Sequence, residues 1–377
     1  MKKMKMIANR KLVLVMMTAV ILAAVVLTGC SKASDNKNNN ESVNQDAGND
    51  NQDTDADKNS EDDKEDESKA PDVTEDDNKE KIQMNIAALK GPTGMGMVKL
   101  MEDAQAGTAA HDYQFTVAGE ADVVSTGLIK GEFDIAAVPC NLASVLYNKT
   151  NGQIKLAGIN TLSVLYIVET GNEINSVEDL KGKTIYSTGY GTTPQYTLNY
   201  LLSSYGLDPE KDLTIEYKSE ATEVAAILES SENAVAMLPQ PYVTTVLMNN
   251  DKVRIALDIE KEWAAKNENS GVVTGVVVVN SEFLNNHPEA VEDFLNEYKA
   301  SAEFVNNDVD AAAELIEKFD LFKAAVAKKA IPYCNITLIQ GTEMKEMARK
   351  YLNVLYEQNP NAVGGELPDD NFYFINE

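Results

Sequence analysis

A polar, glycine-containing loop between a short strand and a helix is the feature that says most about this chain. The stretch Val177–Pro194 reads VEDLKGKTIYSTGYGTTP. We interpret it as an amphipathic turn, a break at Gly182, a strand over Thr184–Tyr186 and a helix that begins at Pro194, capped by one of the two preceding threonines. Such a junction favours ligand binding, because helix amides point outward and glycines let a ligand approach the backbone. An ordinary strand-to-helix connection is the alternative.

The first thirty residues have the pattern of an export signal. Five basic residues precede an apolar run from Leu12 to Leu27, and the sequence Leu-Thr-Gly-Cys ends at Cys30. Small residues before a cysteine at the end of an apolar core resemble a bacterial lipobox, whose cysteine is acylated and becomes the mature N-terminus. We therefore expect residues 1–30 to be a lipoprotein signal peptide, with palmitate or a similar acyl chain on Cys30. A plain transmembrane anchor is the alternative, although the run is slightly short for a bilayer span.

The next fifty residues cannot build a core. Residues 31–80 contain 18 acidic residues and 6 lysines, with almost nothing apolar. Low hydrophobicity combined with high net charge prevents folding, and like charges extend the chain. We expect a disordered acidic tether that holds the folded part away from the membrane.

The remainder is acidic and long enough for two lobes. Residues 81–377 carry 22 Lys plus Arg against 42 Asp plus Glu, within a whole-chain charge of −27. Because nucleic-acid binding needs basic patches, nucleic acid is excluded as a partner. A folded part of this length usually divides into two lobes.

Cysteine and histidine are too sparse to suggest a metal centre or a catalytic triad. Besides Cys30 the chain has Cys140 and Cys334, and its histidines are His111 and His287. Neither histidine has a carboxylate or cysteine at a metal-like spacing, so we expect no metal and no cofactor. An exported location allows a disulfide between Cys140 and Cys334, and two buried free thiols are the alternative.

Strands and helices alternate along the folded part. The first expected strands are Ile82–Leu89, Tyr113–Val117 and Phe133–Val138, and Asn141 is the expected cap of the following helix. This order implies a parallel sheet, in which ligands bind outside the carboxyl ends of the strands. Two further apolar strands, at 162–168 and 272–280, are expected to leave the first lobe and return to it. We expect strands at 213–217, 234–238 and 253–257, and helices at 195–205, 224–229, 311–319 and 343–357.

Four phrases in this order carry a resemblance. They are GEFDIA at 131–136, DLKGKTI at 179–185, LPQP at 238–241 and FL followed by HPE at 283–289. Behind a lipobox, they resemble the solute-binding lipoproteins of ABC importers, in the nitrate, sulfonate, taurine and thiamine-precursor family. The resemblance covers residues 82–377. It implies an α/β, type II periplasmic-binding-protein fold, with lobe I at 82–169 and 272–377, lobe II at 170–271, and two crossing strands as the hinge.

The resemblance also implies a function and a site. The protein would be a lipid-anchored monomer on the extracytoplasmic face of the cell membrane that captures a small molecule between its lobes and delivers it to a permease and ATPase complex. A Gly191→Val substitution is expected to abolish binding by blocking the loop. Tyr166, Tyr190 and Tyr196 are candidates for stacking on the ligand, and core packing is the alternative for each. The residues expected at the site are Gly91, Thr93, Gly94, Met95, Glu120, Pro139, Cys140, Asn141, Tyr166, Ser187, Thr188, Tyr190, Thr192, Thr193, Gln240 and Tyr242.

One departure from sulfonate-binding members bears on the ligand. The chain has three arginines, Arg10, Arg254 and Arg349, and none lies in an expected cleft loop. Because a bidentate clamp for an anion is therefore not evident, we expect a neutral or weakly charged organic ligand, for example a heterocycle. The rival functions are a ligand sensor or adhesin and a cofactor-biosynthesis enzyme of the same fold. Export and the scarcity of histidine and cysteine argue against the enzyme.

Overall fold

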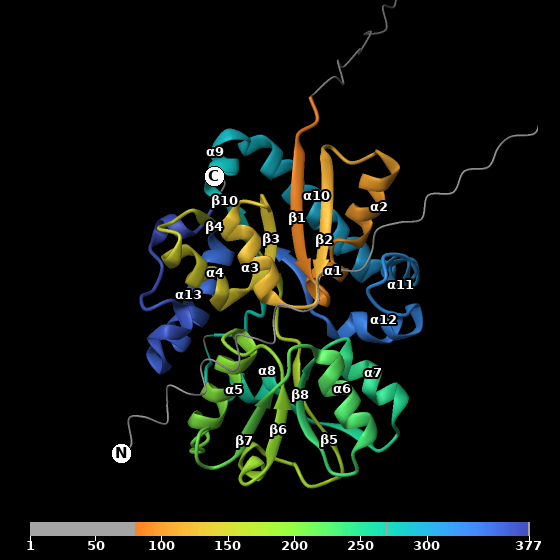
Figure 1. Cartoon of the computed structure of the whole chain (residues 1–377), viewed down its shortest axis with the longest axis vertical. Coiled ribbons are helices and arrows are strands. Elements are labelled where there is room, and N and C mark those ends of the chain that lie inside the picture. Colours follow the sequence, from red (N-terminus) through yellow and green to blue (C-terminus); the bar gives the residue numbers. More distant parts are fainter. Residues whose placement is uncertain (1–79, 269, 376–377) are drawn as a thin grey trace, which may run out of the picture. The chain divides into compact units, whose positions relative to one another are not determined.

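A computed structural model describes residues 80–268 and 270–375 of the chain. The expected signal peptide with Cys30, and the expected tether up to residue 79, lie outside these residues. The described residues belong to one compact unit. This unit contains two sheets with helices packed against them, which lie in different halves of Figure 1. The α/β class expected from the sequence is confirmed.

The first sheet has six strands in the order β11-β4-β10-β3-β1-β2. Strand β1 runs parallel to β2 and β3, whereas β10 runs antiparallel to β3 and β4, and β11 antiparallel to β4. The bounds are β1 (Gln83–Leu89), β2 (Asp112–Ala118), β3 (Ile135–Pro139), β4 (Ile154–Thr161), β10 (Gly275–Asn280) and β11 (Ile336–Ile339).

The second sheet has five strands in the order β7-β6-β8-β5-β9. Strand β6 is parallel to β7 and β8, and β5 is antiparallel to β8 and β9. The first sheet contains the same arrangement in its strands β2-β1-β3-β10-β4. Strand β10 takes the place of β5, since each runs antiparallel to both of its neighbours. The bounds are β5 (Leu165–Thr170), β6 (Thr184–Ser187), β7 (Thr214–Tyr217), β8 (Val235–Pro239) and β9 (Val253–Asp258).

The chain passes between the sheets at 162–164 and at 265–274, both outside the strands. The two passages lie side by side, because the Thr274 N–H donates to the Thr161 carbonyl over 3.1 Å. The expected crossing strand 272–280 therefore begins only at Gly275, and the expected strand 162–168 begins at Leu165 and belongs to the second sheet. The division into lobes at 170 and 272 remains a prediction.

Strand β10 shows why the first sheet forms here. Its sequence is Gly-Val-Val-Val-Val-Asn, and all four valines have no exposed surface. Val276 and Val278 pack into the core on one face of the sheet, and Val277 and Val279 into the core on the other. β-branched residues suit a strand buried on both faces, so a continuous valine run predicts a central strand.

Helices cover both faces of the first sheet. On one face, α10 buries an apolar stripe that runs from Val291 to Val305 at helical spacing. The opposite face is covered by α3, α4 and α13. The bounds are α1 (Pro92–Met95), α2 (Val98–Ala106), α3 (Ala121–Lys130), α4 (Cys140–Lys149), α9 (Ser281–Asn286), α10 (Pro288–Asn307), α11 (Val309–Lys318), α12 (Ala324–Ala330) and α13 (Gly341–Gln358).

The second sheet is covered in the same way. Helix α5 and the short η1 lie on one face, and α6 and α7 on the other. The sequence did not reveal α8, whose Trp263 packs into the core of the first sheet rather than that of the second. The bounds are η1 (Val177–Leu180), α5 (Thr193–Ser204), α6 (Ala221–Ser230), α7 (Tyr242–Asn249) and α8 (Ile259–Ala264).

The segment after α13, up to residue 375, packs against the first sheet. The short helices η3 (Pro360–Val363) and η4 (Asp370–Phe372) follow α13, and η2 (Ile331–Tyr333) precedes β11. Phe372 is fully buried and Tyr373 bridges to Leu156.

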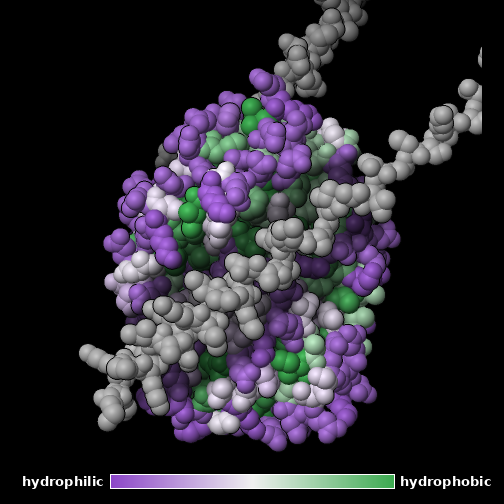
Figure 2. Space-filling view, in the orientation of Figure 1, coloured by the Kyte–Doolittle hydropathy of each residue, from purple (hydrophilic) through white to green (hydrophobic). Residues whose placement is uncertain are grey.

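Two further observations concern the described residues as a whole. Cys140 and Cys334 are both buried and free, so the alternative of two thiols holds and the disulfide does not. Between residues 80 and 375, leaving out 269, no helix combines the length and apolar character needed to cross a membrane. Hydrophilic residues dominate the outer margins of the face seen in Figure 2.

Candidate functional site

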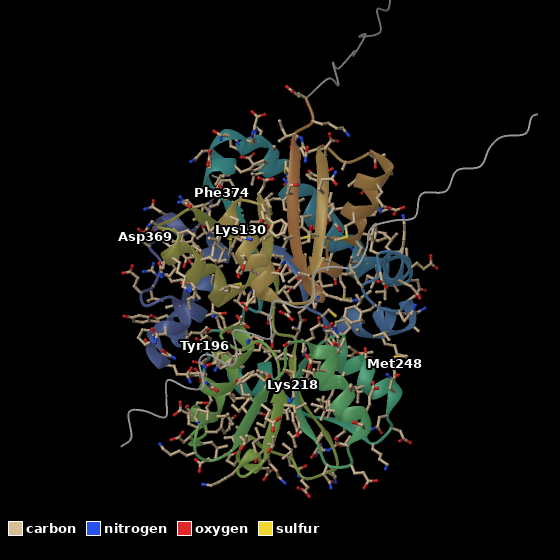
Figure 3. The ribbon with its side chains drawn as sticks, in the orientation of Figure 1. Lys130, Tyr196, Lys218, Met248, Asp369 and Phe374 are labelled. Atoms are coloured by element: carbon tan, nitrogen blue, oxygen red, sulfur yellow. The ribbon has the colours of Figure 1, made fainter. Side chains whose placement is uncertain are left out.

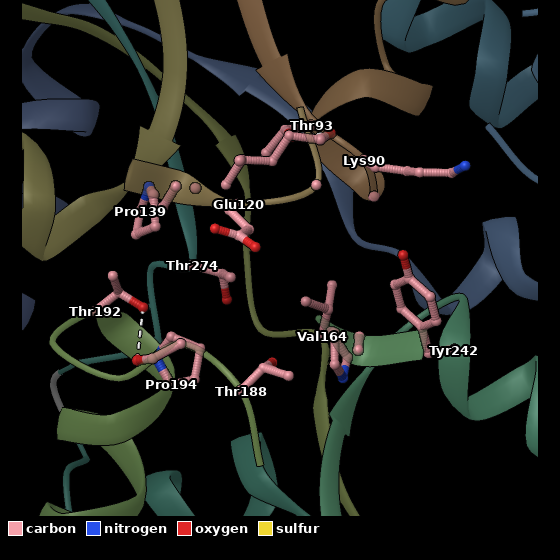
Figure 4. Close-up of a pocket in the computed structure, with 18 of the residues that line it drawn as sticks. Lys90, Thr93, Glu120, Pro139, Val164, Thr188, Thr192, Pro194, Tyr242 and Thr274 are labelled. Carbon is pink, nitrogen blue, oxygen red and sulfur yellow. Dashed lines mark hydrogen bonds between the residues drawn. The ribbon is translucent and has the colours of Figure 1, made fainter. Parts of the chain in front are cut away.

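A cavity of about 530 Å³ lies where the ends of the two sheets meet (Figure 4). Its wall combines residues from both sheets and both passages between them. The lining residues are Leu89, Lys90, Gly91, Pro92, Thr93, Gly119, Glu120, Ala121, Asp122, Pro139, Thr161, Val164, Leu165, Thr188, Gly189, Tyr190, Thr192, Pro194, Tyr217, Lys218, Ser219, Ala221, Pro239, Gln240, Tyr242, Thr274 and Gly275.

The topology explains why these residues meet. Seven of the strands, β1 to β4 and β6 to β8, send their carboxyl ends or the loops that follow to the cavity wall. The antiparallel strands β5 and β10 begin at the same edges, at Leu165 and Gly275. In open α/β sheets this edge is where ligands bind. The cavity therefore has the position that the strand order predicts.

Nine of the sixteen residues expected at the site line the cavity. Gln240 is held firmly, because its Oε1 accepts hydrogen bonds from the Thr244 N–H and hydroxyl. Tyr242 packs edge to face against Phe322, a residue that lies between α11 and α12. The nine are Gly91, Thr93, Glu120, Pro139, Thr188, Tyr190, Thr192, Gln240 and Tyr242.

Gly94 and Met95 do not reach the cavity. The residues after β1 form the single helical turn α1, which Pro92 begins. Met95 is fully buried in the core formed with α11 and α12. A Cβ on Gly94 would stand 2.9 Å from the Leu89 carbonyl oxygen, so Gly94 lets α1 pack against the end of β1.

Cys140 and Asn141 have structural positions rather than a place on the wall. Helix α4 begins at Cys140, one residue before the expected cap, so Asn141 lies inside the helix and is fully buried. The Asn141 amide donates to the carbonyl oxygens of Gly191 (3.3 Å) and Ala362 (3.0 Å). The Cys140 thiol has no exposed surface, and burial raises its pKa.

Three residues of the second sheet also lie behind the wall. Tyr166 is half-buried against α6 and α7, and burial raises its pKa to about 12. Ser187 is fully buried and its hydroxyl donates to the Thr188 carbonyl oxygen. Thr193 is fully buried and its hydroxyl donates to Asn141 Oδ1 over 3.2 Å. None of these three residues lines the cavity, and the hydrogen bonds of Ser187 and Thr193 help to position the loop between β6 and α5.

Charge in the cavity comes chiefly from Glu120. Its carboxylate points into the space between the two sheets, whereas the Lys90 ammonium points away from it (Figure 4). Lys218, labelled in Figure 3, directly follows β7 and forms an ion pair with Glu216 over 3.2 Å. Of the two charged residues labelled in Figure 4, Glu120 directs its charge inward and Lys90 does not.

Three hydroxyl groups of the lining residues have no hydrogen-bond partner among the residues that the structure describes. They belong to Thr161, Thr274 and Tyr217. Thr161 is only 1 % exposed. Burial raises the pKa of the Tyr217 hydroxyl, so it stays protonated and able to donate. Because buried polar groups normally have partners, each of these hydroxyls would gain one from a water or a polar ligand group that reached it.

The comparisons with known proteins agree with this geometry. A family model described as NMT1/THI5 like matches residues 153–312. A crystal structure of an ABC transporter from Parabacteroides distasonis is 26% identical, covers 78% of this chain and 98% of its own, and has a TM-score of 0.63. The chain has the fold of an ABC-importer substrate-binding protein. No curated protein matches its sequence.

More distant structures share this substrate-binding-protein fold. The alkanesulfonate-binding protein from Xanthomonas axonopodis pv. citri bound to MOPS is 14% identical, with a TM-score of 0.62, over 78% of this chain and 98% of that one. A ligand-binding component of an ABC-type import system from Staphylococcus aureus is 12% identical, with a TM-score of 0.61, over 78% and 96%. At such identities the likeness concerns the fold alone.

The sequence missed the part of the wall that follows β7 and the two passages. Tyr217, Lys218 and Ser219 follow a strand parallel to β6. Ligands bind outside the carboxyl ends of strands in such sheets, so the end of the expected strand 213–217 could have identified these residues. Thr161 and Thr274 carried no such signal, because their closeness depends on two passages far apart in the sequence.

Proposed function

We propose that this protein is an extracytoplasmic, lipid-anchored solute-binding protein. It captures a small organic molecule in the cavity and delivers it to the permease and ATPase of an ABC importer. The cavity carries the proposal, because its wall is divided between two sheets that the chain connects by only two passages. A ligand that contacts both sides stabilises their closed arrangement, and the closed form docks on the permease.

The composition of the wall supports an organic ligand that is neutral or weakly charged. No arginine lines the cavity among the described residues. The Arg254 side chain, on β9, is engaged by the Glu169 carboxylate and the Ile174 carbonyl oxygen. Arg349 lies on α13. A bidentate arginine clamp for a sulfonate or phosphate is therefore not part of the proposal.

A binding protein is favoured over an enzyme by the chemistry of the wall. Histidine and cysteine, which commonly act as bases and nucleophiles, do not occur in the lining within the described residues. The two described histidines lie on the loop before β2 and between α9 and α10. The wall offers hydrogen bonds and aromatic faces, which suit binding and release.

The experiment that tests binding is a melting-temperature screen of the Cys30→Ser chain against sulfonates, oxyanions, nucleobases, flavins and aromatic acids. Binding to the native state raises the melting temperature by mass action. Thr188→Trp fills the cavity and should remove the shift of any hit. Thr214→Trp adds the same ring at an exposed position on β7 and should retain it. A hit that survives Thr188→Trp would show binding outside the cavity.

The lipid anchor has its own test. The full chain should fractionate with membranes, because acylation of Cys30 supplies the anchor. The Cys30→Ser chain should lose that acylation, and metabolic labelling with an alkyne fatty acid should mark only the unchanged chain. Labelling of both chains would place the lipid elsewhere or exclude the lipobox.

A further inference from the structure

Glu120 lies at a position where a side chain can accept hydrogen bonds from backbone N–H groups. It occupies the N-cap of α3, where an acidic side chain can accept hydrogen bonds from the first amides of the helix. Its carboxylate makes no such bond. It has no ion-pair or hydrogen-bond partner within residues 80–268 and 270–375 and points into the cavity instead (Figure 4).

The second sheet offers a direct comparison. Strand β7 and helix α6 repeat the arrangement of β2 and α3, and Glu220 takes the place of Glu120 as the N-cap. The local sequences are Gly-Glu-Ala and Ser-Glu-Ala. The Glu220 N–H donates to Glu223 Oε1 over 3.1 Å in a capping box, and the Glu220 carboxylate accepts from the Thr222 hydroxyl over 3.0 Å. At two equivalent positions, one carboxylate is therefore satisfied and the other is left for the cavity.

No lysine of the wall neutralises Glu120. The ion pair of Lys218 is with Glu216, and its ammonium also lies 5.6 Å from the centre of the Tyr186 ring. The Lys90 ammonium points away from Glu120. Asp122 adds a second negative charge to the same wall. The Glu220 carboxylate lies close as well, with Oε1 2.8 Å from the position that a Cβ on Gly119 would occupy.

The remainder of the wall also suits an organic cation. Tyr190 and Tyr217 face each other edge to face with their centroids 5.4 Å apart, and both line the cavity. Tyrosine faces attract a cation that a carboxylate has already drawn into a site. Thr161, a lining residue that is 1 % exposed, adds a hydroxyl that has no hydrogen-bond partner among the described residues.

We propose that the ligand carries a protonated nitrogen and that Glu120 binds it in the cavity. This inference rests on the proposed function and refines its ligand class from weakly charged to cationic. The amino ends of α3, α5 and α6 also reach the wall and bear partial positive charge, which suits acceptor atoms elsewhere in the ligand. They do not replace Glu120, whose full charge is opposite in sign to that of the proposed nitrogen.

The test uses nine small-molecule probes. Each of three groups, benzyl, cyclohexylmethyl and pyrimidin-5-ylmethyl, is tested with an ammonium, a hydroxyl or a sulfonate substituent. Melting temperatures of the Cys30→Ser chain are measured at ~10 mM of each probe, and hits are titrated by calorimetry. On at least one of the three groups the ammonium should bind most tightly. Glu120→Gln should weaken that binding by about 10- to 100-fold, the range expected for a lost hydrogen bond to a charged group.

Glu220→Gln is the matched control. It removes a neighbouring carboxylate that already accepts from the Thr222 hydroxyl, so it lowers the negative potential near the site without removing the carboxylate that points into the cavity. The affinity for the ammonium probe should therefore fall much less than in Glu120→Gln, by less than about threefold. Equal losses in both variants would show that only the general negative potential matters and would overturn the role of Glu120. An unchanged affinity in Glu120→Gln would overturn it as well.

The outcomes also separate this inference from the proposed function. If hydroxyl or sulfonate probes bind and their ammonium counterparts do not, the cationic ligand is excluded and the solute-binding function stands. If none of the nine probes changes the melting temperature, and the broader screen is also silent, the result counts against both.

Discussion

The hydroxyl of Thr193 donates to Asn141 Oδ1 over 3.2 Å, and both side chains are fully buried. This bond joins α4, which follows strand β3 of the first sheet, to α5, which follows strand β6 of the second. The Asn141 amide also donates to the carbonyl oxygens of Gly191 and Ala362. One side chain thus connects the loop at the cavity with the C-terminal segment.

Replacing Asn141 should loosen that loop. Asn141→Ala removes three hydrogen bonds at a buried position and leaves their partners without a substitute, so we expect a loss of about 2–3 kcal/mol in the free energy of unfolding. Amide hydrogen exchange over residues 188–195 should become faster, since Gly191 and Thr193 lose their partner.

Asn148 provides the control for this prediction. It lies on the same helix and donates to the carbonyl oxygens of Val363 and Glu366, but not to the loop. Asn148→Ala should cost about 1 kcal/mol for each hydrogen bond lost and leave exchange over 188–195 unchanged. Faster exchange there in both variants would mean that the loop follows global stability and not the contact with Asn141.

Gly191 is required for its backbone conformation. The expectation that a side chain would block the loop needs correction, because Gly191 does not line the cavity and a Cβ there would meet nothing within 4 Å. Its φ is +74°, a value that favours glycine. Its N–H donates to Gln195 Oε1 over 2.6 Å, so relaxing the strain would move the start of α5.

We therefore predict the same stability loss but different binding for two alanine variants. Gly182 has a φ of +75° and also has open space around its Cβ position, but it lies outside the cavity wall. Gly191→Ala and Gly182→Ala should each cost about 1 kcal/mol in chemical denaturation. Only Gly191→Ala should weaken binding of a hit from the screen. Equal affinity in both variants would exclude a role for the loop conformation.

The two thiols should be unreactive in the folded protein. Cys140 and Cys334 are fully buried, and burial raises the pKa of both. Thiolate is the reactive form, so a Cys30→Ser chain should not react with Ellman's reagent at neutral pH. In guanidinium chloride both thiols should react. Release of one equivalent without denaturant would show that a thiol is accessible.

The sequence predicted the fold well because its strands and helices carry strong local patterns. The four buried valines of β10 and the apolar stripe of α10 each determine an element without reference to distant residues. Strand order then placed the predicted site at the carboxyl ends of β1, β2, β3, β6 and β8, which all reach the cavity wall. This inference needs only the topology of the sheets.

The details that failed depend on distant contacts. Asn141 has the residue type of a helix cap, yet its amide bonds to Ala362, which lies 221 positions away in the sequence. Met95 follows a glycine and was expected at the ligand, but residues of α11 and α12 bury it. A local pattern does not contain such contacts, so it identifies the loop and not the direction of each side chain.

Glu260 should give the protein a measurable pH dependence. Burial raises the pKa of this carboxyl group, which accepts a hydrogen bond from the Val272 N–H over 3.2 Å beside the second passage. From the unfolded pKa of about 4.3 up to the raised folded pKa, the native state binds more protons than the unfolded state. The free energy of unfolding therefore falls as the pH rises through this window.

Glu260→Gln removes this titration and keeps an oxygen that can accept from Val272. The variant should melt at a higher temperature than the unchanged chain at pH 7, and the two should converge below about pH 4, where Glu260 is protonated in both states.

Asp179 gives the opposite sign, because hydrogen bonds from the Asn175 and Ser176 amides lower its pKa. Asp179→Asn should therefore melt lower at pH 7 and converge as the pH falls. A difference for Glu260→Gln that stays constant from pH 4 to pH 7 would mean that packing, and not the buried charge, sets the effect.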